Sequence, residues 1–118
     1  MISPTKRIET PASKIMIEIK DWITGRESEY IQEPILAAVQ LGGSAMGKGD
    51  VNIAHVDARK AIQDSAHREI EAYIARVGDE TNPQKILETI LDMPEEDYIF
   101  VQEEVRKAKE NGKKKSIA

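Results

Sequence analysis

Residues 14–20, Lys-Ile-Met-Ile-Glu-Ile-Lys, alternate isoleucine with other side chains, and this alternation constrains the fold more than any other feature of the chain. Ile15, Ile17 and Ile19 fall on one face, so the period of two predicts a half-buried β-strand. A single strand leaves its backbone donors and acceptors unpaired and therefore needs a partner strand.

The best candidate for the partner strand is the segment at about residues 71–77, which is rich in Ile, Tyr and Val. Apolar residues from Ile70 to Val77 also recur at helical spacing, so the preceding helix could continue through this segment instead. The pairing requirement of residues 14–20 favours a strand here. Pairing of residues 14–20 across a dimer is the alternative.

The first predicted helix begins at a capping box formed by Thr24 and Glu27. Pro34 should kink or divide this helix, because proline cannot donate a hydrogen bond to the preceding turn. Four apolar residues at helical spacing predict its buried stripe: Ile31, Ile35, Ala38 and Val39. A glycine-rich flexible loop should follow over residues 42–50.

A second helix should start at about Asn52, and its stripe consists mostly of small residues, so another element must pack close to it: Ala58, Ala61, Ile62, Ser65 and Ala66. Asn82 and Pro83 form a helix start, with an N-cap followed by proline at the first helical position. The buried stripe of this third helix should be Ile86, Leu87, Ile90 and Leu91.

The last helix should start after Pro94, run to about Glu110 and stop at Gly112. It carries more apolar surface than one stripe requires. Tyr98, Val101 and Val105 suffice for the core, whereas Ile99 and Phe100 point elsewhere. This excess indicates either a partner surface or a Phe100 side chain that packs beneath the hairpin formed by the two predicted strands.

Together these segments predict an α+β fold, in which a small two-stranded antiparallel sheet packs against three to four helices. Prolines at positions 4 and 11 predict a flexible N-terminal lead over residues 1–13. A single α+β domain should cover residues 14–111, since 118 residues leave little room for a second domain. A flexible basic tail should cover residues 112–118.

The composition argues against several classes of function. The net charge of −4 disfavours general nucleic-acid binding, which requires positive side chains to neutralise phosphates. The absence of cysteine excludes disulfides, thiolate catalysis and zinc–thiolate sites. No apolar run approaches the roughly 20 residues that span a bilayer, and no apolar segment follows the basic N-terminus as in a signal peptide. We therefore expect a cytoplasmic protein without a membrane partner.

Motifs that could carry chemistry are weak. Residues 42–49 nearly match a phosphate-binding loop, but Gly49 replaces the hydroxyl residue that holds magnesium, and a helix precedes the loop instead of a strand. His55 and His67 point about 120° apart on one predicted helix and cannot share a metal without help. Carboxylates interleaved with lysine and arginine are typical of a solvated face: Glu95, Glu96, Asp97, Glu103 and Glu104. We therefore expect no enzyme, no cofactor and no metal.

Three segments occur in an informative order. Residues 19–27 read Ile-Lys-Asp-Trp-Ile-Thr-Gly-Arg-Glu, and an Ile/Val-rich stretch ends in Val-Gly-Asp at residues 77–79. Residues 90–105 read Ile-Leu-Asp-Met-Pro-Glu-Glu-Asp-Tyr-Ile-Phe-Val-Gln-Glu-Glu-Val. In this order they resemble the small tail assembly chaperones of long-tailed, siphovirus-like bacteriophages, over about residues 15–107. The residues that carry the resemblance are Trp22, Thr24, Gly25, Arg26, Glu27, Asp97, Tyr98, Phe100 and Val101.

The resemblance implies a protein of the infected host's cytoplasm that binds the tape measure protein, recruits the tail tube protein and is not retained in the virion. It also implies a longer product made by −1 ribosomal frameshifting, for which residues 112–115, Gly-Lys-Lys-Lys, would encode the slippery codons. Small and spare apolar residues are the candidates for contact with the tape measure protein: Ala58, Ala61, Ile62, Ala66, Ile99 and Phe100.

Two departures from the family pattern are visible: Pro34 interrupts a helix, and the second strand alternates less clearly than in the family. The main alternative is a phage or prophage structural protein, such as a neck or minor tail component. A third hypothesis is a small regulatory protein that contacts nucleic acid through residues 113–115, although the acidic balance opposes it. The oligomeric state stays open, and a homo-oligomer is compatible with the sequence.

Overall fold

The computed structural model describes the backbone of residues 4–47 and 51–117, and the side chains of residues 4–39 and 58–111. Contacts divide the chain into two compact units. One unit comprises the residues up to Thr24 together with those from Ile70 onward, and the other comprises Gly25–Glu69. The single domain expected over residues 14–111 is therefore two units, because residues 25–69 contact each other more than the rest of the chain.

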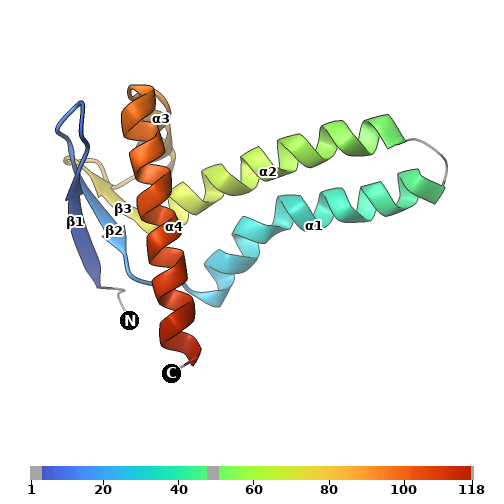
Figure 1. The fold of residues 1–118 in the computed structure, drawn as a ribbon, viewed down its shortest axis with the longest axis horizontal. Helices are drawn as coiled ribbons and strands as arrows, with labels where there is room; N and C mark the ends of the chain where they lie inside the picture. Colours follow the sequence, from blue (N-terminus) through green and yellow to red (C-terminus); the bar gives the residue numbers. More distant parts are fainter. Residues whose placement is uncertain (1–3, 48–50, 118) are drawn as a thin grey trace. The chain divides into compact units, whose positions relative to one another are not determined.

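The first unit contains a three-stranded antiparallel sheet in the order β1-β2-β3 (Figure 1). Its strands are β1 (Thr5–Glu9), β2 (Met16–Lys20) and β3 (Ile74–Val77). The α+β class and the strand within residues 14–20 are confirmed. The sheet has three strands, whereas the sequence predicted only two. The central strand is β2, whose pairing needs are thus met on both sides within the chain.

Strand β1 corrects the expectation of a flexible lead over residues 1–13. It pairs with β2 from Thr5 opposite Lys20 to Glu9 opposite Met16. Ile8 is the only apolar residue of this strand, so the strand shows no alternating pattern in the sequence. Its place in the sheet follows from pairing with β2, which is a tertiary condition that local patterns do not reveal.

Helix α2 (Val51–Tyr73) passes directly into β3, which explains why this region fits two templates. Val77 lies opposite Ile17, whereas Ile74 lies opposite Ile19, so β3 holds one extra residue in a bulge. The bulge leaves both Ile74 and Val77 buried although they are three positions apart. The spacing therefore imitates a helix, and the predicted strand at 71–77 begins only at Ile74.

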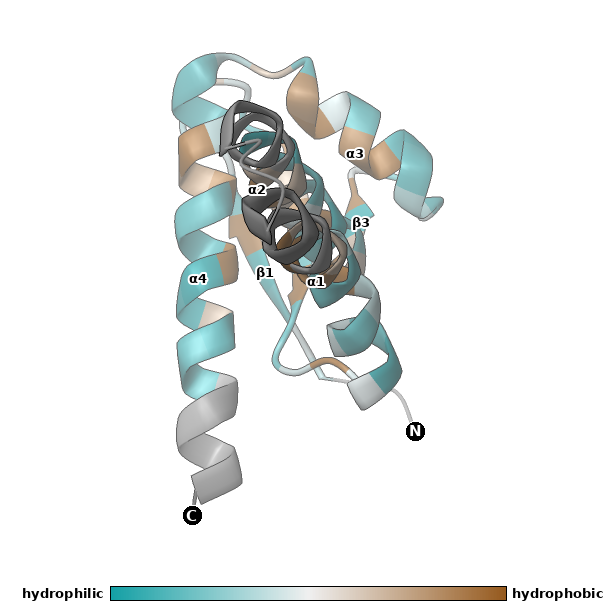
Figure 2. Cartoon of the chain, turned by 90° about the vertical axis from the view of Figure 1, so that its right-hand side faces the viewer, coloured by the Kyte–Doolittle hydropathy of each residue, from teal (hydrophilic) through white to brown (hydrophobic). Residues whose placement is uncertain are grey.

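Helices α3 (Pro83–Leu91) and α4 (Glu95–Ile117) complete the first unit, with α3 against β3 and α4 against β2. Figure 2 shows apolar segments on α3 and on the half of α4 nearer to it, whereas most of α4 is hydrophilic. The core consists mainly of aliphatic side chains: Ile8, Ile17, Ile19, Ile70, Ala72, Tyr73, Ile74, Val77, Ile86, Ile90, Val101 and Val105.

The sequence predicted the start of α3 correctly and the end of α4 wrongly. Asn82 caps α3, since its side-chain oxygen accepts hydrogen bonds from the backbone N–H groups of Gln84 and Lys85. The predicted stop at Gly112 is wrong, because α4 continues to Ile117. A single glycine inside a helix costs only about 1 kcal/mol, and the lysines that follow it are good helix formers.

The second unit is a hairpin of two antiparallel helices, α1 (Gly25–Gly47) and the part of α2 up to Glu69 (Figure 1). The predicted start after Thr24 is confirmed. The flexible loop predicted over residues 42–50 is wrong for residues 42–47, which are helical, and its other residues lie outside the described chain. Pro34 lies inside α1 without dividing it, and α1 changes direction in this half of the helix.

Replacing Ile17 by alanine tests the central position of β2. Ile17 is fully enclosed, so Ile17→Ala should lower the free energy of unfolding by about 2–5 kcal/mol, measured by urea unfolding. The control Ile99→Ala changes an exposed isoleucine of the same unit and should stay within about 0.5 kcal/mol of the wild type. Equal losses from the two substitutions would contradict the assigned core.

Candidate functional site

The turn between β1 and β2 is fixed to the start of α4 by the buried carboxylate of Asp97. Asp97 Oδ1 accepts a hydrogen bond from the Ala12 N–H at 2.8 Å, and Asp97 Oδ2 accepts one from the Ser13 N–H at 2.9 Å. The Ser13 hydroxyl donates a further hydrogen bond to the same carboxylate. Consecutive backbone N–H groups that converge on an anion form a site suited to a carboxylate. Asp97 is completely buried, so its carboxylate is enclosed by these donors.

The turn itself is closed by Thr10, which is also completely buried. The Thr10 N–H donates to the Ile15 carbonyl at 3.1 Å, and the Thr10 hydroxyl oxygen accepts from the Ile15 N–H at 2.9 Å. Lys14 adopts the left-handed conformation with φ of 57°, which turns the chain back into β2. The two N–H groups that bind Asp97 are thereby presented on one side of the turn.

The hydrogen bonds at this site outweigh the effect of burial on Asp97. Burial alone would raise the pKa of Asp97, because it penalises the charged form. The donors on Ser13 and Ala12, with the positive charge of Lys14, instead hold the pKa of Asp97 below its ordinary value of 3.8. The carboxylate is thus ionised and committed to the turn, and it does not belong to the solvated face that the sequence predicted for it.

Replacing Asp97 tests this anchor, because Asp97→Asn removes the charge and one acceptor. The variant should unfold at lower urea concentration and temperature than the wild type at neutral pH. A carboxylate with a lowered pKa stabilises the fold fully above its ordinary pKa of 3.8, and this contribution is lost as the pH falls through the folded-state value. The stability difference between wild type and variant should therefore shrink below that pH.

The matched control is Glu96→Gln, which removes an exposed carboxylate from the same first turn of α4. This control accounts for the interaction of a negative charge with the helix dipole, so it should cost less than Asp97→Asn. Equal losses, or a difference between wild type and Asp97→Asn that stays constant down to acidic pH, would contradict the anchor.

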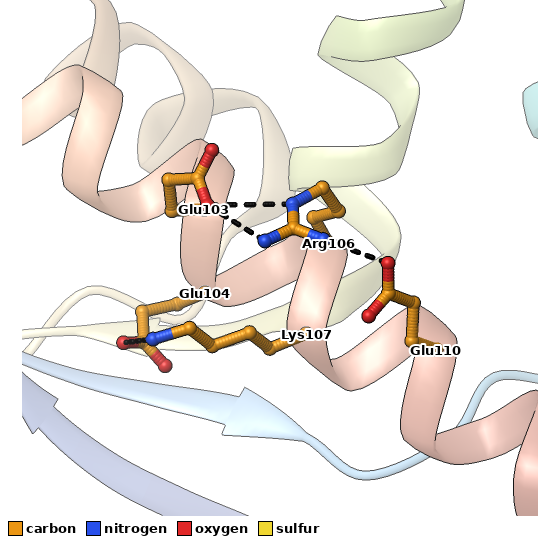
Figure 3. A network of polar contacts seen from close by, with 5 residues as sticks. All are labelled: Glu103, Glu104, Arg106, Lys107 and Glu110. Carbon is orange, nitrogen blue, oxygen red and sulfur yellow. Dashed lines mark hydrogen bonds and ion pairs between the residues drawn. The ribbon is translucent and has the colours of Figure 1, made fainter.

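The other carboxylates in the middle of α4 form surface ion pairs (Figure 3). Arg106 contacts Glu103 at 3.0 Å and Glu110 at 2.7 Å, and Lys107 contacts Glu104 at 3.5 Å. Hydrogen bonds from Arg106 to Glu103, with the charges of Glu103 and Glu110, raise the pKa of Arg106. The Arg106 pairs are exposed, and exposed pairs of this spacing stabilise a helix only slightly, so they indicate a solvated face. Glu104 is an exception, because its side chain is only 12% exposed.

Within the described residues, no group of three or more His, Asp or Glu side chains is placed to hold a metal ion. His67 is half-buried on α2, while the side chain of His55 lies outside the described residues. The near phosphate-binding loop of residues 42–49 also lies outside the described side chains. None of the described helices is both long enough and apolar enough to cross a bilayer.

In the hairpin unit, Arg68 of α2 holds the beginning of α1. Its Nη1 donates to the Tyr30 carbonyl oxygen at 2.7 Å, and its guanidinium carbon lies 4.3 Å from the centroid of the Tyr30 ring. The same nitrogen lies 3.6 Å from Glu33 Oε2. A planar guanidinium can stack on an aromatic ring and donate in its plane at once, which lysine cannot do.

A groove of about 330 Å³ runs between α1 and α2 of this hairpin. Its apolar lining comes from Pro34, Ala37 and Ala38 on one helix and from Ala61 on the other. Of the small-residue stripe predicted on the second helix, Ala61 lines this groove and is buried, whereas Ile62 is exposed. Charged side chains border the groove: Glu33, Lys60, Asp64 and Arg68.

The hairpin exposes apolar side chains that the predicted pattern placed in the core. Ile31 is buried as predicted, but Ile35 and Val39 are exposed, and Leu36 is 56% exposed. On α2, Ile62 is 63% exposed, while Ala58 and Ala66 are half-buried. Residues 34–39 are apolar on every side of the helix, which is a signal that one buried stripe cannot absorb them all.

The two apolar candidates on α4 differ in exposure. Ile99 is 49% exposed, whereas Phe100 is half-buried, so the ring is neither enclosed nor free. Val101 and Val105 are buried, as the sequence predicted. These α4 residues belong to the first unit, and the α2 candidates belong to the hairpin unit.

The residues that carry the family resemblance differ in how deeply they are buried. Asp97 anchors the turn, Val101 is buried in the core, and Tyr98 and Trp22 are half-buried. The segment from Thr24 to Glu27 forms the passage into α1, with Gly25 as the first helical residue and Arg26 exposed in the first turn.

Comparison with protein-family models, with curated proteins and with solved structures found no significant match.

Replacing Arg68 tests how the hairpin is held. Arg68→Ala removes the hydrogen bond to Tyr30 and the contact with its ring, so the hairpin should lose about 1–3 kcal/mol of local stability. Hydrogen exchange of the α2 backbone amides measures this loss directly. Arg59→Ala, at an exposed position of the same helix, should leave the exchange rates nearly unchanged. Similar exchange in both variants would contradict the role of Arg68.

Proposed function

We propose that this protein is a non-catalytic tail assembly chaperone of a long-tailed bacteriophage, which binds the tape measure protein in the host cytoplasm and promotes assembly of the tail tube. The observation that carries the proposal is the apolar surface on the hairpin unit. Val39 on α1 is 65% exposed, and Ile62 on α2 is 63% exposed. Contiguous apolar patches are typical of protein-binding surfaces, and in this proposal these side chains belong to one such surface.

The groove of the hairpin supports a helical partner. Its lining of Ala37, Ala38 and Ala61 lets another backbone approach closely, and charged side chains border it. An apolar centre with a polar rim is the usual composition of a protein interface. A tape measure protein is a long, apolar helical chain, so repeated binding of its helix to grooves of this kind would keep it soluble.

The order of the segments at residues 19–27, 77–79 and 90–105 supports the same function. In this proposal the first and third segments serve the fold, because they contain the entry into α1 and the Asp97 anchor. Contact with the partner is then left to the hairpin and to Ile99 on α4. The apolar side chains exposed on the hairpin lie outside these segments, so they support the proposal independently of the resemblance.

Co-expression with the tape measure protein of the same phage tests the proposal. The wild-type chain should increase the soluble fraction of the tape measure protein severalfold. Val39→Asp and Ile62→Asp should abolish most of this increase, because each places a charge on the apolar surface. Gln32→Asp and Gln63→Asp add the same charge at exposed polar positions of the same helices and should retain it.

Purified phage particles provide the second measurement. A chaperone should be absent from them, whereas a neck or minor tail protein should be present in fixed copy number. No gain in solubility with the wild-type chain, or its presence in particles, would overturn the chaperone proposal and favour the structural alternative.

A further inference from the structure

Strand β1 is an edge strand, and its register shows which of its backbone groups face outward. The Asp21 N–H donates to the Pro4 carbonyl, and the Thr10 N–H donates to the Ile15 carbonyl. Positions that exchange hydrogen bonds with β2 alternate along an antiparallel ladder. The backbone N–H and carbonyl groups of the even-numbered residues of β1 therefore point toward β2. The N–H and carbonyl groups of Thr5, Arg7 and Glu9 therefore point away from the sheet.

This outward edge is open within the described chain. The sheet ends at β1, and no described strand pairs with its outer side. Thr5, Arg7 and Glu9 are all exposed. The opposite edge is partly closed, because Val77 of β3 exchanges two backbone hydrogen bonds with Glu80. An open edge is a template for a further strand.

The charges on this edge select the strand that fits it. Arg7 and Glu9 are two residues apart, so they lie on the same face of the sheet, opposite to the face of the buried Ile8. Charged edge strands normally reject unrelated strands. A strand with the same two charges at the same spacing, running antiparallel, places an opposite charge against each of them.

We propose that two copies of this chain pair through β1 in an antiparallel dimer, with Ile8 opposite Ile8 of the second copy. Arg7 then lies opposite Glu9 of the second copy, and Glu9 lies opposite Arg7 of the second copy. In this register the outward N–H and carbonyl groups of Arg7 and Glu9 form the new ladder. The two three-stranded sheets become one continuous sheet, with Ile8 of each copy side by side on the core face.

Neighbouring registers are less favourable. Centring the pair on Arg7 would place two guanidinium groups opposite each other, and like charges in this position destabilise a sheet. Pro11 lies just beyond β1 and has no N–H to donate, which limits the ladder at that end. The charge pattern and the proline together favour the register centred on Ile8 and a second copy of this chain as the partner.

The mass of the full chain in solution, measured by sedimentation equilibrium over a range of concentrations, tests the dimer. The wild type should approach twice the chain mass of 13.2 kDa as concentration rises. Arg7→Glu places Glu against Glu, and Glu9→Arg places Arg against Arg, so each variant alone should be monomeric. An equimolar mixture of the two variants should restore the dimer, because every cross-strand pair then has opposite charges.

The control is Glu18→Gln, because Arg7 also forms an ion pair with Glu18 of its own chain at 3.4 Å. This variant removes the internal pair and leaves the open edge intact, so it should dimerise like the wild type. Circular dichroism checks that each variant is folded. A monomeric wild type at every concentration, a Glu9→Arg variant that dimerises like the wild type, or a mixture that stays monomeric would each overturn the proposal.

Discussion

The buried carboxylate of Asp97 is the interaction on which the first unit depends. It joins a turn near the N-terminus to a helix that begins more than eighty residues later, since Ala12 and Asp97 are 85 positions apart. A buried charge is costly unless donors surround it, and here two backbone N–H groups and a hydroxyl do so. The position of β1, the shape of the turn and the start of α4 are thereby fixed together.

The sheet shows how a strand with little apolar content can still be well placed. β1 contributes only Ile8 to the core, and its remaining residues are polar or charged. Its backbone is held by β2, and its turn is held by Asp97. The same polar composition leaves an exposed edge whose charges are complementary to a second copy of itself. A strand that is weakly specified by hydrophobicity can therefore be strongly specified by charge and register.

The hairpin unit follows a different physical rule. Small residues and charged side chains line a groove between its two helices, and Arg68 adds a directed contact with Tyr30. Apolar side chains on the outer surface, above all Val39 and Ile62, are not covered by the facing helix and stay exposed. This separation gives one unit a conventional core and leaves exposed apolar side chains on the other, which the proposed function assigns to contact with a helical partner.

The sequence by itself determined the elements whose signals are local. The alternation of Ile17 and Ile19 predicted β2, and Asn82 with Pro83 predicted the start of α3, because side-chain periodicity and capping act over a few residues. Only the tertiary structure decided the rest. The pairing of β1, the bulge that buries both Ile74 and Val77, the enclosure of Asp97 and the exposure of Val39 all depend on groups distant in the chain. Local pattern cannot reveal these features, because they arise from which segments meet and how much apolar surface each meeting can cover.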